Sequence, residues 1–126
     1  MMIADIQIDQ LVHFETATDG TAVRLIVKDA AGHQVGLVLS VETLSSLVMT
    51  LPTMASFAAQ RAHGDPGMRV TYPAREFQLE LAPNNLRILT IGTPDGFNVS
   101  FTLTEEFSQE LGEAHLAGIG YRIVTH

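Results

Sequence analysis

Three carboxylates at helical spacing are the densest group of potentially reactive side chains in the sequence. Glu106, Glu110 and Glu113 lie at i, i+4 and i+7, so a helix would carry them on one face. A hard divalent cation needs several oxygens that converge from more than one structural element, and one helical face does not supply them. The spacing therefore predicts a solvated acidic face and no metal site.

A second group pairs carboxylates with cations on neighbouring segments. Glu15 and Arg24 flank an Asp-Gly turn, and Glu80 and Arg87 flank an Asn-Asn turn. One interpretation is a cross-strand ion pair in each hairpin, which contributes about 0.2–1 kcal/mol at a wet surface. The alternative is that Arg24 and Arg87, together with Lys28, contact an anion or a partner.

Two further candidates flank a proline. Tyr72 and Arg75 lie on either side of Pro73, where they would form an exposed aromatic and cationic contact unless they pack as ordinary loop residues. No glycine-rich phosphate loop, H-E-x-x-H motif or G-x-S-x-G motif accompanies them, and the sequence has no cysteine. We therefore expect no cofactor and find no support for catalysis.

The elements that carry these residues occur twice. The segment HFETATDGTAVRLIV (13–27) matches QLELAPNNLRILTI (78–91), which aligns Glu15 with Glu80 and Arg24 with Arg87. Downstream, GHQVGLVLS (32–40) matches GFNVSFTLT (96–104). The sequence predicts one domain, 1–126, built from repeat 1 (1–64) and repeat 2 (65–126).

The turn residues support hairpins in both repeats. Asp19-Gly20 is typical of a two-residue type I′ loop, which would pair Glu15 with Arg24, and Asn84-Asn85 suits the equivalent loop. Pro94 fits the first central position of a type I turn. The apolar face expected for repeat 1 consists of Val12, Phe14, Val23, Leu25, Val27, Val35, Leu37 and Leu39. That of repeat 2 consists of Phe77, Leu79, Leu81, Leu86, Ile88, Val99, Phe101 and Leu103.

A helix follows the last strand of each repeat without a loop. Ser40 and Thr104 are predicted N-caps, and Leu44, Leu47, Val48 and Leu51 form the apolar stripe of the first helix. Pro52 either kinks this helix or starts a second one. Met49, Met54 and Phe57 suit a packed interior; if Pro52 breaks the helix, they would form an adaptable interface instead.

The expected fold is α+β. DIQID (5–9) and RVTYP (69–73) would each add a strand, which gives a ββββα unit twice, with antiparallel sheets packed on two helices. YRIVTH (121–126) is predicted to form a C-terminal strand.

Composition narrows the function. The net charge of −7 disfavours avid binding to duplex phosphate. The N-terminal segment MMIADIQIDQ has no basic stretch, and Asp5 and Asp9 interrupt any apolar core of a signal peptide. No apolar run approaches the ~20 residues that cross a bilayer. We expect a cytoplasmic protein that does not enter the membrane.

A ββββα unit that occurs twice resembles the PUR-repeat proteins and the related whirly-type single-strand binders. The resemblance lies in LVLSVETLSSLV and FTLTEEFSQELG, which follow paired hairpins. It implies two docked repeats whose sheets bind single-stranded nucleic acid on a basic, aromatic surface. The predicted outer face here has no aromatic residue to stack a base. The favoured hypothesis is therefore a non-catalytic module that binds protein, as a homodimer or with another partner, and single-strand binding is the alternative.

Overall fold

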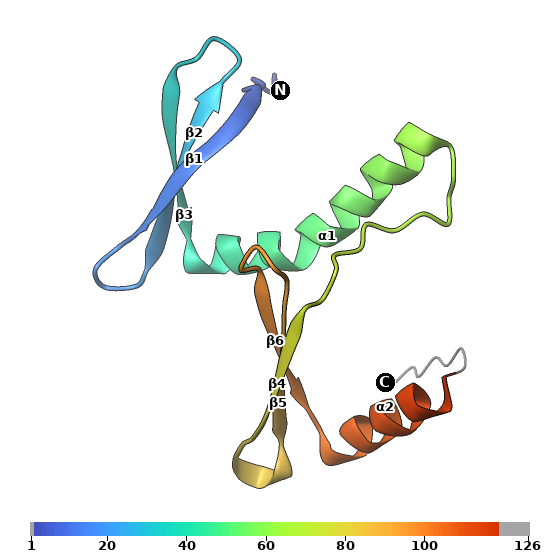
Figure 1. Cartoon of the computed structure of the whole chain (residues 1–126). Coiled ribbons are helices and arrows are strands. Elements are labelled where there is room, and N and C mark those ends of the chain that lie inside the picture. Colours follow the sequence, from blue (N-terminus) through green and yellow to red (C-terminus); the bar gives the residue numbers. More distant parts are fainter. Residues whose placement is uncertain (1, 119–126) are drawn as a thin grey trace. The chain divides into compact units, whose positions relative to one another are not determined.

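The computed structural model describes residues 2–118 and has the predicted α+β class, with a hairpin-rich unit that occurs twice (Figure 1). The chain divides into two compact units, Met1–Val70 and Thr71–His126. Within residues 2–118, each unit has one antiparallel three-stranded sheet, called here sheet 1 and sheet 2, and one helix that continues directly from the third strand.

The two units have the same order of elements. Unit 1 contains β1 (Ile8–Thr16), β2 (Ala22–Asp29), β3 (Gln34–Ser40) and α1 (Val41–His63). Unit 2 contains β4 (Glu76–Leu81), the short 3-10 turn η1 (Pro83–Asn85), β5 (Arg87–Gly92), β6 (Asn98–Leu103) and α2 (Glu105–Ala117). In both sheets the strands follow one another in sequence order, each antiparallel to the next.

The prediction of a fourth strand in each unit is wrong. Residues 5–7 are not a separate strand, although Gln7 O accepts a hydrogen bond from the Ala30 N–H at 3.1 Å, and Ile8 and Asp9 already belong to β1. Residues 69–73 are not a strand either. Pro73 has no N–H to give to a ladder, which explains why pairing starts only after it. The C-terminal strand predicted at 121–126 lies outside the described residues.

The first hairpin turn has the predicted register but not the predicted type. Glu15 pairs with Arg24 as expected. However, Gly20 alone has a positive φ (73°), and Asp19 Oδ1 accepts hydrogen bonds from the N–H (3.1 Å) and the hydroxyl (2.7 Å) of Thr21. These bonds hold Asp19 outside the left-handed region, so the loop is not a type I′ turn.

The equivalent turn in unit 2 is of the predicted type. Asn84 and Asn85 have φ values of 64° and 60°, and the Leu86 N–H donates to Pro83 O at 3.4 Å. Positive φ at both central positions defines the type I′ turn.

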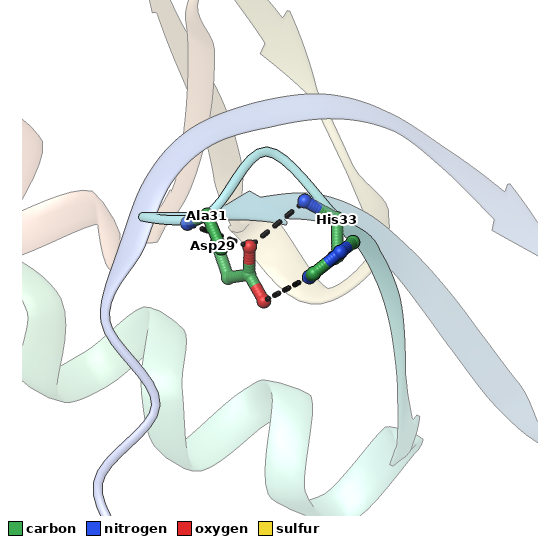
Figure 2. A network of polar contacts seen from close by, with 3 residues as sticks. All are labelled: Asp29, Ala31 and His33. Atoms are coloured by element: carbon green, nitrogen blue, oxygen red, sulfur yellow. Dashed lines mark hydrogen bonds and ion pairs between the residues drawn. The ribbon is translucent and has the colours of Figure 1, made fainter.

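The β2–β3 turn is held by one carboxylate (Figure 2). Asp29 Oδ1 accepts from the N–H groups of Ala31 (3.0 Å) and His33 (2.8 Å), and Oδ2 lies 3.7 Å from His33 Nδ1. In the β5–β6 turn the hydroxyl of Thr93 takes this place and accepts from the N–H of Phe97 at 3.2 Å. Pro94 occupies the predicted first central position.

Both helices begin at the predicted N-caps. Ser40 accepts from the Thr43 N–H at 3.2 Å, and Thr104 accepts from the Phe107 N–H at 3.1 Å. A left-handed glycine ends each helix. Of the two alternatives for Pro52, a second helix is excluded, because α1 runs through this residue without interruption.

Few side chains of the described residues are buried. The buried apolar residues are Ile26, Val27 and Leu103, and neither helix has a buried residue. Met49 (80% exposed), Met54 (52%) and Phe57 (60%) do not lie in the packed interior that their spacing predicted. Each unit therefore leaves most of its apolar surface open.

Candidate functional site

The apolar face of sheet 2 is the most distinctive surface of unit 2. The pairing of the three strands places on this face Phe77, Leu79, Leu81, Arg87, Leu89, Ile91, Val99, Phe101 and Leu103. The polar face carries Glu76, Gln78, Glu80, Ile88, Thr90, Gly92, Asn98, Ser100 and Thr102. This separation is typical of an antiparallel sheet with one face packed against protein and the other exposed to solvent.

The described residues of unit 2, up to Gly118, leave this face uncovered. Phe77 is 77% exposed, Leu79 54%, Leu81 83% and Phe101 51%, while Leu103 is buried. Helix α2 leads away from the end of β6 rather than lying across the strands (Figure 1). The sheet and helix bound an open groove of about 670 Å³, lined by Leu89, Phe101, Thr102, Leu103, Thr104, Glu106, Phe107 and Leu111.

Sheet 1 has a similar face, although a bulge changes its composition. The register of β1 slips at Asp9 and again at Val12, so Leu11 pairs with Val27 and Phe14 with Leu25. Val12, which the alternation placed on the apolar face, is an unpaired bulge residue. The apolar side chains of β1 are exposed, with Leu11 at 60% and Phe14 at 66%.

Two predicted contact residues lie on the polar face of sheet 1. Arg24 and Lys28 are on β2, where alternation puts them on one face. The predicted Glu15–Arg24 ion pair is absent from the described residues: Glu15 Oε1 lies 3.5 Å from Nε2 of His13. The Arg24 guanidinium lies against Gly36, where an added Cβ would be 2.8 Å from Nε.

The third predicted cation has a different environment. Arg87 pairs with Leu81 and Leu103 on the apolar face of sheet 2, and Glu80 pairs with Ile88. The alignment of Arg24 with Arg87 is therefore wrong by one residue. The Ala82 N–H bonds to Leu86 O, so three residues, Pro83–Asn85, form the loop and set the register of β5. A shift of one residue moves every side chain to the other face. For the same reason Ile88, which was predicted on the apolar face, lies on the polar face, and Leu89 and Ile91 lie on the apolar one.

Tyr72 and Arg75 lie in the segment that precedes β4. The Tyr72 ring is 5.6 Å from that of Phe97, tilted by 41°, and both side chains are more than half exposed. The Arg75 N–H donates to Gly92 O at 2.8 Å. Gly92 ends β5 and Arg87 begins it, so the two arginines lie at opposite ends of that strand.

Among residues 2–118, no group of three or more His, Asp or Glu side chains could hold a metal ion. None of the described helices has the length and apolarity required to cross a membrane. No protein-family model matches the sequence, and no curated protein or solved structure is significantly similar to it.

Sequence reasoning placed Phe77, Leu79 and Leu81 in a core and did not identify them as an accessible surface. Their alternation in EFQLEL correctly predicts one apolar face. The pattern does not reveal what covers that face. The candidate functional site is therefore the apolar face of sheet 2, with its exposed β4 edge.

Proposed function

We propose that this chain is a small non-catalytic module that forms a homodimer through sheet 2, by means of the exposed apolar side chains of β4. The supporting observation is the exposure of Phe77, Leu79 and Leu81 on one side of a well-paired sheet. Burial of a large apolar side chain contributes about 1.5–3 kcal/mol, so covering these strands is a substantial driving force for association.

The chemistry of this face favours a protein partner. Phe77, Leu79, Leu81 and Phe101 are each more than half exposed in the part of unit 2 that the structure describes. A cluster of large, exposed apolar side chains on one face of a sheet marks a protein-interaction surface.

A second copy is the partner that this surface fits best. Homodimer interfaces are typically more apolar than the rest of a protein surface, which matches the composition of this face. The face is almost free of charge, with Arg87 as its one charged residue, so two copies meet without like-charge repulsion across it.

Sedimentation equilibrium of the purified chain tests the proposal, with twice the monomer mass as the expected result. Leu81→Lys places a charge on the apolar face and is expected to weaken the dimer at least about 100-fold, or roughly 2.7 kcal/mol. Val38→Lys is the matched control, because Val38 is also exposed (70%) but lies on the polar face of sheet 1. Circular dichroism checks that both variants fold.

A strictly monomeric wild-type chain at high micromolar concentration would contradict the proposal. Equal weakening by Leu81→Lys and Val38→Lys would also count against it, because the effect would then not depend on this face.

Single-strand binding is the second candidate, and one feature favours it. The exposed Tyr72–Phe97 pair is a surface on which a base could stack, and Arg75 lies three residues from Tyr72. Fluorescence polarisation with labelled oligonucleotides at low salt tests this candidate. Binding that Tyr72→Ala removes would support it, and no binding by the wild-type chain would exclude it.

A further inference from the structure

Among the described residues of unit 2, strand β4 pairs only with β5, and its other edge carries an unusual combination of groups. The Ala82 N–H donates to Leu86 O at 2.8 Å next to the turn. Hydrogen-bonded and non-bonded pairs alternate along an antiparallel ladder, so the even-numbered residues of β4 bond to β5. The odd-numbered residues Phe77, Leu79 and Leu81 direct their N–H and C=O groups away from the sheet. Their side chains are also the exposed apolar ones.

The other sheet edges are less suited to pairing with another strand. Bulges at Asp9 and Val12 interrupt β1, and the Arg24 side chain lies over Gly36 in the middle of β3. In contrast, β4 pairs with β5 in unbroken register and contains no proline, lysine or arginine.

The edge of β6 is regular but polar. The Thr93 N–H donates to Phe97 O at 3.0 Å, which fixes the alternation along this hairpin. The outward-facing residues of β6 are therefore Asn98, Ser100 and Thr102, which have small polar side chains. Pairing at the β6 edge would satisfy backbone groups but would not bury large apolar side chains. Pairing at the β4 edge does both.

Charge distinguishes the ways in which two copies of β4 can pair. In three antiparallel registers, at least two of the outward-facing residues Phe77, Leu79 and Leu81 of each copy face those of the other copy. The two-fold axis of these registers lies at Gln78, Leu79 or Glu80. An axis at Gln78 places Glu76 opposite Glu80 of the second copy, and an axis at Glu80 places that residue opposite itself. Like charges directly opposite each other destabilise a sheet.

The register centred on Leu79 avoids both conflicts. It places Glu80 opposite Gln78 and brings Phe77 opposite Leu81 of the second copy. In this register Leu79 faces Leu79 of the second copy, and Phe77 and Leu81 face each other. All three outward-facing residues of each β4 strand therefore form hydrogen-bonded pairs. The axis at Glu80 would instead place Phe77 opposite Pro83, which has no N–H to donate.

From these relationships we infer that two chains join through antiparallel β4–β4 pairing with the two-fold axis at Leu79, which produces a continuous six-stranded sheet. The inference rests on the proposed function that the chain self-associates. It adds the strand that pairs, the register and the residue on the axis.

The absence of cysteine from the sequence makes the register directly measurable. Facing residues of a hydrogen-bonded antiparallel pair have Cα atoms about 5.5 Å apart, within the range that a disulfide spans. Single cysteines at Gln78, Leu79 and Glu80 therefore report the three possible axes. After mild oxidation, Leu79→Cys is expected to form covalent dimers, and Gln78→Cys and Glu80→Cys are expected to remain largely uncrosslinked.

A mixed experiment supplies a matched control. Phe77→Cys and Leu81→Cys should each crosslink poorly alone, because both lie far from the axis, whereas a mixture should form the disulfide between the two variants.

Backbone amide exchange of the wild-type chain tests the same pairing without any substitution. The N–H groups of Phe77, Leu79 and Leu81 should be protected in the dimer and lose protection on dilution to monomer.

The outcomes separate this inference from the proposed function. A wild-type dimer that crosslinks through Gln78→Cys or Glu80→Cys, or that leaves the odd-numbered β4 amides unprotected, overturns the β4 pairing and leaves the homodimer intact. A wild-type monomer overturns both. Protection of these amides in a monomer would show that β4 pairs within its own chain and would also overturn the inference.

Discussion

Leu81 and Arg87 face each other across β4 and β5, which places a guanidinium on the otherwise apolar face of sheet 2. Arg87 Nη1 has a long hydrogen bond of 3.3 Å to Asn85 O. A cation that becomes covered in an interface loses hydration, so Arg87 should oppose self-association. We expect Arg87→Leu to lower the dimer Kd about tenfold, or ~1.4 kcal/mol, in a sedimentation velocity dilution series.

Arg24→Leu is the control for this prediction, because Arg24 lies on the polar face of sheet 1. It should leave the Kd unchanged. A weaker dimer for Arg87→Leu would indicate that the guanidinium has an interfacial partner and does not simply lose water.

The turn between β4 and β5 gives a prediction about stability. Asn85 has φ 60°, a conformation that glycine adopts without steric cost and that type I′ turns favour at this position. Asn85→Gly is expected to raise the free energy of unfolding by about 0.5–1 kcal/mol, and Asn85→Val to lower it by about 1–2 kcal/mol. The chain has no tryptophan, so urea unfolding should be followed by circular dichroism.

The matched substitution is Asn98→Gly. Asn98 is the first residue of β6, where glycine adds backbone entropy to the unfolded state without relieving strain. This variant should be less stable than the wild type. If Asn85→Gly destabilised the chain as much as Asn98→Gly, the positive φ at Asn85 would not limit stability.

The features predicted correctly from sequence are those set by neighbouring residues. Caps and most turns depend on a few adjacent side chains, so Ser40, Thr104, Pro94 and the Asn-Asn turn follow from local chemistry. The prediction of a type I′ turn at Asp19-Gly20 was wrong for an equally local reason, because Thr21 donates two hydrogen bonds to Asp19.

The sequence was less informative where a one-residue difference changes the face of a strand. Loop length sets the register of β5, and the alignment of Arg24 with Arg87 assumed a register that the pairing of Leu81 with Arg87 excludes. Alternation in β4 identifies an apolar face but applies equally to a core and to an interface. The candidate site depends on that difference, which only three-dimensional exposure reveals.

The N-cap of α2 gives a third prediction. The Thr104 hydroxyl accepts from the Phe107 N–H at 3.1 Å, and without it this donor has no protein acceptor in the first helical turn. Thr104→Ala should lower the free energy of unfolding by about 1 kcal/mol. Thr104→Ser should keep most of the stabilisation that the cap provides, because serine also has a hydroxyl that can accept this hydrogen bond. Thr102→Ala, in the strand just before the cap, is the control. If Thr102→Ala lowered the free energy of unfolding by as much as Thr104→Ala, the effect would belong to the strand and not to the cap.

Two turn carboxylates predict a dependence of stability on pH. The side-chain hydrogen bond from Thr93 lowers the pKa of Asp95 below its ordinary 3.8, and the Thr21 hydroxyl, aided by the Thr21 N–H, lowers that of Asp19. A lowered folded-state pKa means that the ionised form stabilises the fold. This contribution is present above the unfolded pKa and is lost as the pH falls through the folded value.

Carbon-detected NMR titration of the aspartate carboxyl groups measures this effect. Thr93→Val removes the hydroxyl that donates to Asp95 and should raise the pKa of Asp95 toward 3.8 while leaving Asp19 unchanged. Thr21→Val should do the reverse, although the backbone N–H of Thr21 still holds the pKa of Asp19 partly lowered. The two variants control for each other, because the turns lie in different units. An Asp95 pKa unchanged by Thr93→Val would show that another donor stabilises this carboxylate.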